Sequence, residues 1–118
     1  MNAEGQQEVT AGYRVLFMLR LSPGAGEAFL REYEAVRWQV AQVPGHISDQ
    51  VCRSADDPDE WLITSEWRSP GDFLAWEATP DHREAAMPMM RHVRKRRSLR
   101  YTVLRETCTA PAGAGDAR

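Results

Sequence analysis

The sequence predicts an α+β fold whose elements follow one another in the order β-α-β-β-α-β. Residues 13–21, YRVLFMLRL, and residues 61–67, WLITSEW, read as strands. Residues 25–43 carry apolar side chains at helical spacing. Turn and helix-start residues separate these segments, so strands and helices alternate along the chain.

The composition is that of one ordinary globular domain. The chain has 118 residues, 42% hydrophobic residues and a net charge of −2, and nothing in these values suggests a nucleic acid or a membrane as partner. It shows no secretion signal and no apolar run near the ~20 residues that span a bilayer. We therefore expect a cytoplasmic domain at 12–108, between disordered tails at 1–11 and 109–118. Its cysteines, Cys52 and Cys108, are expected as free thiols.

The first strand, 13–21, is apolar on both faces. Leu16 and Met18 point to one side, and the other side carries Tyr13, Val15, Phe17, Leu19 and Leu21. A strand of this kind needs cover on both sides of its sheet. The following helix has a single apolar stripe, formed by Phe29, Tyr33, Val36, Val40 and Val43. Pro44-Gly45 ends that helix, and residues 46–54 form a weaker strand.

Two helix-start signals follow the strand at 61–67. Ser-Pro-Gly-Asp at 69–72 opens a short helix that contains Phe73 and Trp76. Thr-Pro-Asp at 79–81 opens a second segment, which we expect to run to about Val93.

Residues 99–107, LRYTVLRET, complete the order as the last strand. The order is that of the ferredoxin-like arrangement, a four-stranded antiparallel sheet with two helices on one face. The chain's own helices leave the other sheet face uncovered. A second copy packed sheet against sheet would cover it, so we expect a homodimer.

His82 is the candidate base. It shares a stripe facing the sheet with Ala86, Met89 and Val93, at spacings of 4, 3 and 4. One interpretation is a partly buried histidine whose ring nitrogen bonds a backbone carbonyl. The other is a general base, because the histidine pKa of ~6.5 lets the ring accept a proton near neutrality.

Aromatic and methionine side chains gather around His82 in the sequence. Trp67 and Trp76 suit either a core or a platform for a flat aromatic ligand. Pro88 removes one hydrogen bond from the helix and should kink it. A kinked helix could leave a cavity lined by Met87, Met89 and Met90, and the alternative is an ordinary core filled by methionine.

Other kinds of site find little support. No glycine-rich flavin or nicotinamide fingerprint is present, and His46, His82 and His92 lie on separate elements, which argues against a metal. The basic run at 91–100 lacks the interleaved aromatics of a nucleic-acid surface. We interpret it as a solvated helix end. Some of its arginines could instead attract an anionic substrate or an acyl carrier protein.

The stretch ITSEWRSPGDFLAWEATPDHREA at 63–85 resembles the antibiotic biosynthesis monooxygenase superfamily, whose members form dimeric α+β barrels. The likeness covers roughly residues 13–107. It looks closest to the small quinone-forming monooxygenases of aromatic polyketide pathways, of the tetracenomycin and actinorhodin type.

The resemblance implies a cofactor-free oxygenase. In that family an anthrone or naphthacenone is deprotonated, its carbanion reduces O₂, and the peroxide collapses to a quinone. Trp67 and His82 correspond to the family's catalytic positions. The remaining candidates are expected to bind substrate: Phe73, Trp76, Arg83, Met89 and Met90.

The sequence also departs from the family pattern. Actinorhodin-type members use asparagines near the strand tryptophan, but the only asparagine here is Asn2, and Ile63 stands four residues before Trp67. Ser65, Gln50 or Arg83 would then have to supply the polar contacts. Ala86 stands where the haem-degrading branch needs an iron ligand, which argues against haem. Two alternatives stay open, an aldol-type polyketide cyclase that uses the same pocket without O₂ and a non-catalytic dimeric binding protein.

Overall fold

A computed structural model describes residues 12–109 of the chain. The elements are β1 (Tyr13–Leu21), α1 (Gly26–Val40), β2 (His46–Arg53), β3 (Glu60–Trp67), α2 (Pro70–Glu77), α3 (Pro80–Met90) and β4 (Val93–Thr102). The predicted order is confirmed, with the last helical region divided into α2 and α3 as the two start signals indicated. The tail expected at 1–11 lies outside the described residues, and so does the tail expected at 109–118 except for Thr109.

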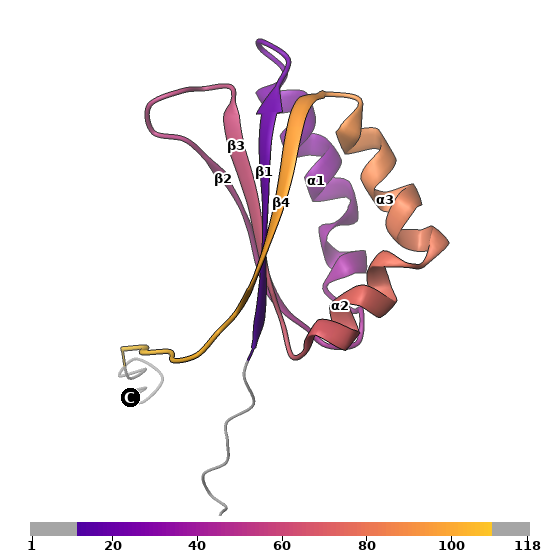
Figure 1. Cartoon of the computed structure of the whole chain (residues 1–118). Helices are drawn as coiled ribbons and strands as arrows, with labels where there is room; N and C mark the ends of the chain where they lie inside the picture. Colours follow the sequence, from indigo (N-terminus) through magenta and orange to yellow (C-terminus); the bar gives the residue numbers. More distant parts are fainter. Residues whose placement is uncertain (1–11, 110–118) are drawn as a thin grey trace, which may run out of the picture.

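The strands form one antiparallel sheet in the order β2-β3-β1-β4. All three helices lie on one face of this sheet, with α1 behind α2 and α3 in the view of Figure 1. The predicted ferredoxin-like architecture is therefore confirmed.

Strand β1 separates two apolar sets of side chains, as its sequence predicted. Val15, Leu19 and Leu21 are buried on the helix side. On the other side, Leu16 pairs in register with Thr64 and Leu99, while Met18 is 44% exposed. Among the described residues, no helix covers this second face, which we call the outer sheet face (Figure 1).

Side-chain caps begin both short helices where the sequence predicted. The Ser69 hydroxyl accepts a hydrogen bond from the Asp72 backbone N–H at 3.1 Å, and the Thr79 hydroxyl accepts one from that of His82 at 3.1 Å. Each cap satisfies a donor that the helix leaves unpaired and contributes about 1 kcal/mol. The Thr79 cap also fixes the backbone of His82.

The last strand begins earlier than expected. It runs from Val93 to Thr102 rather than over 99–107, so the basic run at 91–100 forms most of a strand and its interpretation as a helix end was wrong. Strand β4 is an edge strand paired only with β1. Charged side chains are tolerated there, because an edge leaves both faces near solvent.

The buried side chains form two clusters rather than one. The first contains Leu19, Leu21, Phe29, Tyr33, Trp61 and Met89. The second contains Val15, Trp67, Phe73, Trp76 and Ala85. Members of both clusters line one cavity between the sheet and the helices. Trp67 and Trp76 therefore belong both to the core and to the cavity wall.

Candidate active site

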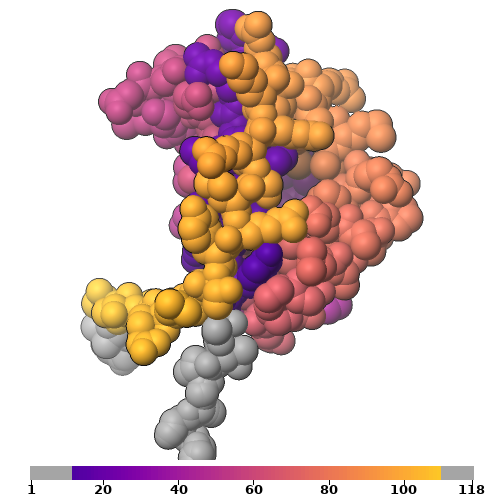
Figure 2. All heavy atoms as spheres, in the orientation of Figure 1, coloured from indigo at the N-terminus to yellow at the C-terminus, as the bar shows by residue number. Residues whose placement is uncertain are grey.

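A cavity of about 440 Å³ lies between the sheet and the three helices. Its walls are mainly apolar, and its size is in the range that holds a drug-sized ligand. Candidate residues from the sequence that line it are Ser65, Trp67, Phe73, Trp76, His82, Met89 and Met90. Figure 2 shows β4 side chains reaching across the opening between the sheet and α2.

His82 lies half-buried in the wall that α3 provides. Its ring stands edge-on to Trp76, with centroids 5.4 Å apart. Burial lowers the pKa of His82, and Arg83 lowers it further, while the Glu77 carboxylate opposes the shift. Within residues 12–109 the imidazole has no hydrogen-bond partner, neither the backbone carbonyl that one interpretation expected nor any side chain. Its nitrogens can therefore bond to a ligand.

Trp67 lies at the end of β3 and is 1% exposed. Its Nε1 donates a hydrogen bond to the Ser65 hydroxyl at 3.0 Å, and Phe73 meets its ring at 67° with centroids 5.5 Å apart. Because the indole N–H is already bonded, the cavity meets Trp67 through its ring. The Ser65 hydroxyl keeps its own proton for another partner.

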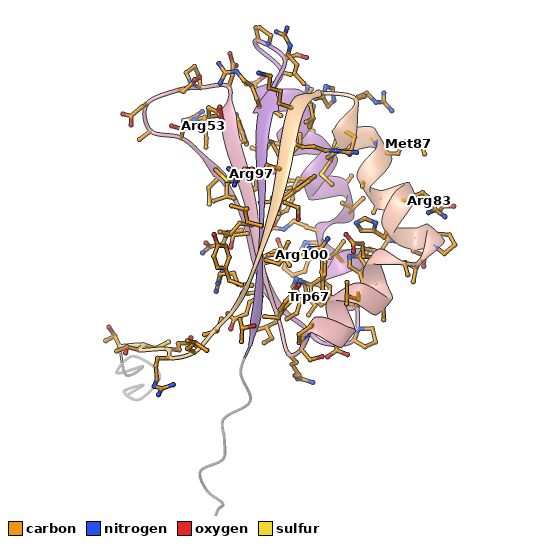
Figure 3. All side chains as sticks on the ribbon, in the orientation of Figure 1. Arg53, Trp67, Arg83, Met87, Arg97 and Arg100 are labelled. Atoms are coloured by element: carbon orange, nitrogen blue, oxygen red, sulfur yellow. The ribbon has the colours of Figure 1, made fainter. Side chains whose placement is uncertain are left out.

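Three residues expected at the pocket do not reach it. Gln50 is exposed on the outer sheet face, opposite Thr64. Arg83 is exposed and points away from the sheet, next to His82 along α3 but on another side of the helix (Figure 3). Met87 is 65% exposed on the outer side of the same helix. The expectation that these residues contact a ligand in the cavity is therefore corrected.

The sequence interpretation missed a polar cluster on the wall formed by α1 and β2. The Tyr33 hydroxyl donates a hydrogen bond to Oδ1 of Asp49, and His46 Nε2 lies 2.8 Å from Oδ2 of the same carboxylate. Burial, together with Asp49, raises the pKa of Tyr33 to about 12. The Arg37 guanidinium lies 5.6 Å from the centre of the Tyr33 ring. Of these four, Tyr33, Arg37 and Asp49 border the cavity.

A β-bulge hides this cluster from strand periodicity. His46 and Asp49 are three residues apart, which puts side chains on opposite faces of a regular strand. In β2, however, the step from His46 to Ser48 matches a single step from Trp67 to Glu66 on β3. The extra residue brings Asp49 back to the face of His46. The signal available in the sequence was the Pro44-Gly45 turn before the strand, where the structure gives Gly45 a φ of +89°.

Strand β4 supplies the polar edge of the cavity. Arg96 and Ser98 line it. The Arg100 guanidinium lies 5.1 Å from the centre of the Phe73 ring and pairs with Glu77 of α2 at 2.8 Å (Figure 3). Both partners are partly exposed, so the pair contributes little stability. Its effect is to link the edge strand to α2 beside the cavity.

Residues 12–109 contain no group of three or more His, Cys, Asp or Glu side chains placed to hold a metal ion. No helix in the described part of the chain is long and apolar enough to cross a membrane.

The chain is similar to several proteins from species of Streptomyces. It is 49% identical over 104 residues to Protein SchA of Streptomyces halstedii, covering 88% of this chain and 27% of that protein. It is 46% identical over 105 residues to the 42.8 kDa protein in the whiE locus of Streptomyces coelicolor, covering 89% and 26%. It is 44% identical over 94 residues to Polyketide synthase CurD of Streptomyces cyaneus, covering 80% and 25%. The chain thus spans about a quarter of the length of these relatives.

Solved structures share the fold at low sequence identity. A conserved protein from Methanosarcina mazei superposes with a TM-score of 0.73 at 14% identity, covering 80% of this chain and 95% of that one. A mutant of SnoaB, a cofactor-independent oxygenase from Streptomyces nogalater, gives 0.70 at 14% identity, covering 81% and 95%. Residues 12–87 match the family model described as antibiotic biosynthesis monooxygenase. The chain therefore belongs to the antibiotic biosynthesis monooxygenase family.

Proposed function

We propose that this domain oxidises a polycyclic aromatic polyketide, of anthrone or naphthacenone type, to a quinone with O₂ and without a cofactor. The observation that carries the proposal is His82, a half-buried imidazole with a lowered pKa at the wall of an apolar cavity. The names of two similar proteins support the context, since one is a polyketide synthase and the other a cofactor-independent oxygenase.

In this reaction neutral His82 accepts a proton from the methylene carbon between two aromatic rings. The resulting carbanion transfers one electron to O₂, and the two radicals combine to a peroxide, which regains the proton from His82. Loss of water then leaves a carbonyl. The methylene has given up two hydrogens and gained one oxygen atom, and the second oxygen atom leaves in the water.

The apolar cavity favours the first step because it replaces water around a charge-delocalised carbanion. Trp67, Phe73 and Trp76 give flat surfaces for a planar ring system. Met89 and Met90 can adapt their flexible side chains to its outline.

Oxygen uptake with a model anthrone tests the proposal. We expect the wild type to consume O₂. In His82→Ala the rate of oxygen uptake should be lower by about 10²-fold or more, the usual effect of removing a general base. Glu84→Ala is the matched control, because Glu84 is an exposed residue of the same helix. Wild-type protein that leaves the anthrone untouched would refute the oxygenase.

A cyclase is the second candidate, and one observation favours it. Ile63 lines the cavity where actinorhodin-type members place an asparagine. Ring closure by aldol addition needs a base but no O₂ partner. A cyclised product formed from an unreduced polyketide without oxygen uptake would select this reaction, and no turnover of either kind would leave a binding protein.

We also propose that the outer sheet face pairs with a second copy of the chain. Met18 is 44% exposed there and lies in register with Leu62. Leu16 and Leu99 lie beside them. A second sheet would remove these side chains from water.

An acyl carrier protein that delivers the polyketide would bind at a different place, the opening of the cavity. Arg96 of β4 is an exposed cation that borders the cavity and could contact such an acidic partner.

A further inference from the structure

The cavity wall formed by α1 and β2 carries hydrogen-bonded side chains that the proposed reaction does not use. We propose that Tyr33, held by Asp49 and His46, accepts a hydrogen bond from a phenolic hydroxyl of the ligand and so sets its orientation in the cavity. This inference rests on the proposed function for the polycyclic phenol, and it assigns the polar contact that Ile63 cannot supply.

The direction of each hydrogen bond follows from the groups involved. An ionised carboxylate only accepts, so Tyr33 must donate its proton to Oδ1 of Asp49, and His46 must carry its proton on Nε2 to donate to Oδ2. With its proton committed, the Tyr33 oxygen offers only lone pairs to the cavity. The site therefore selects a hydrogen-bond donor on the ligand, such as a phenol, over an ether or a bare ring.

The cluster is built rather than incidental. Tyr33 is 7% exposed, and the side chains of His46 and Asp49 are 6% and 12% exposed. The His46 ring stands edge-on to Trp67 with centroids 5.3 Å apart, which fixes the imidazole against the wall. Three polar side chains from two elements are thus held in one arrangement before any ligand enters.

The sheet register places this acceptor beside the other candidate contacts. Asp49 lies directly opposite Ser65 of β3, and Ser65 bonds to Trp67. A second hollow of about 250 Å³ borders the same cluster, and its lining includes Tyr33, His46 and Asp49. Tyr33 and Asp49 border both spaces, so they form part of the partition between them.

Binding of three unreactive probes tests the inference. 2-Hydroxyanthraquinone, 2-methoxyanthraquinone and anthraquinone would be titrated at pH 6, with quenching of tryptophan fluorescence as the readout. We expect the wild type to bind the hydroxy compound about tenfold more tightly than either other probe, the effect of one hydrogen bond to a charge-assisted acceptor. Tyr33→Phe should reduce this preference to about twofold or less, and His46→Gln should weaken it by releasing Asp49.

Glu84→Ala is the control, since Glu84 is an exposed residue of α3 that does not line the cavity. The preference is a ratio measured on each variant, so general damage to the cavity cancels from it. An equal ratio in the wild type and Tyr33→Phe, or no preference in the wild type, would overturn the inference. Oxygen uptake is measured separately on the wild type. If the wild type prefers the phenol but consumes no O₂, the inference about Tyr33 stands and the proposed oxygenase activity is refuted.

Discussion

The imidazole of His82 stands edge-on to the indole of Trp76, with centroids 5.4 Å apart and ring planes at 88°. Trp76 is 9% exposed and belongs to the second of the two buried clusters. The contact therefore joins a candidate base to a fixed part of the wall. Burial of the imidazole is the main cause of the lowered pKa of His82.

This pKa shift predicts the acid limb of the pH–rate profile. The neutral form of His82 is the base, so a lowered pKa keeps it active below the ordinary histidine value of ~6.5, and the rate should fall only at lower pH. Arg83→Gln removes a like charge and should move the limb to higher pH, while Glu77→Gln should move it lower. Initial oxygen-uptake rates between pH 4 and 8 measure these limbs. Identical limbs in all three proteins would exclude His82 as the titrating base.

Ser65→Ala should destabilise the fold through Trp67. The indole N–H of Trp67 would lose its acceptor at a site that is 1% exposed. We expect the free energy of unfolding to fall by about 1–2 kcal/mol in urea titrations. Ser98→Ala, at an exposed position of β4, should change it by less than about 0.5 kcal/mol. Equal effects would mean that the bond between Trp67 and Ser65 does not stabilise the wall.

Alanine substitutions at Gly45 and Gly24 distinguish the cost of backbone strain from the cost of steric overlap. Both have positive φ, +89° and +78°, where a side chain costs about 1–2 kcal/mol. A Cβ at Gly24 would have nothing within 4 Å, whereas one at Gly45 would overlap the Asp72 side chain. Gly45→Ala should therefore lower the melting temperature more than Gly24→Ala does. Matching losses would show that the overlap is relieved at no cost.

The proposed dimer can be broken on the outer sheet face. Met18→Glu would place a charge at the centre of the apolar set, and we expect a monomer by light scattering after size exclusion. Met87→Glu is the matched control on the outer side of α3 and should leave the dimer intact. A wild type that elutes as a monomer would contradict the pairing.

Local signals predicted the parts of the fold that local chemistry decides. The two faces of β1 and the caps at Ser69 and Thr79 could be read directly, because side-chain alternation and capping depend on neighbours in sequence. Strand β4 could not be predicted with its correct bounds, because five of its ten residues are Lys or Arg. Its extended conformation comes from pairing with β1.

The candidate site divides in the same way. Trp67, Trp76 and His82 follow regular elements, and the structure brings them to one cavity. Gln50 was expected at the pocket, but its neighbour Asp49 borders the cavity, because the bulge in β2 decides which of the two faces the helices. Tyr33 was counted as an apolar stripe residue, and only the tertiary contact with Asp49 reveals its hydroxyl as part of a polar cluster.

Isotope labelling tests the central claim most directly. The purified protein would first be treated with a chelator and freed of flavin, and would then react with a model anthrone under ¹⁸O₂. Mass spectrometry would measure the ¹⁸O content of the quinone. The account predicts one ¹⁸O atom in each quinone formed, one O₂ consumed per product, and loss of both signals in His82→Ala. Quinone that carries oxygen from water, or labelling that persists at the wild-type rate without His82, would contradict it.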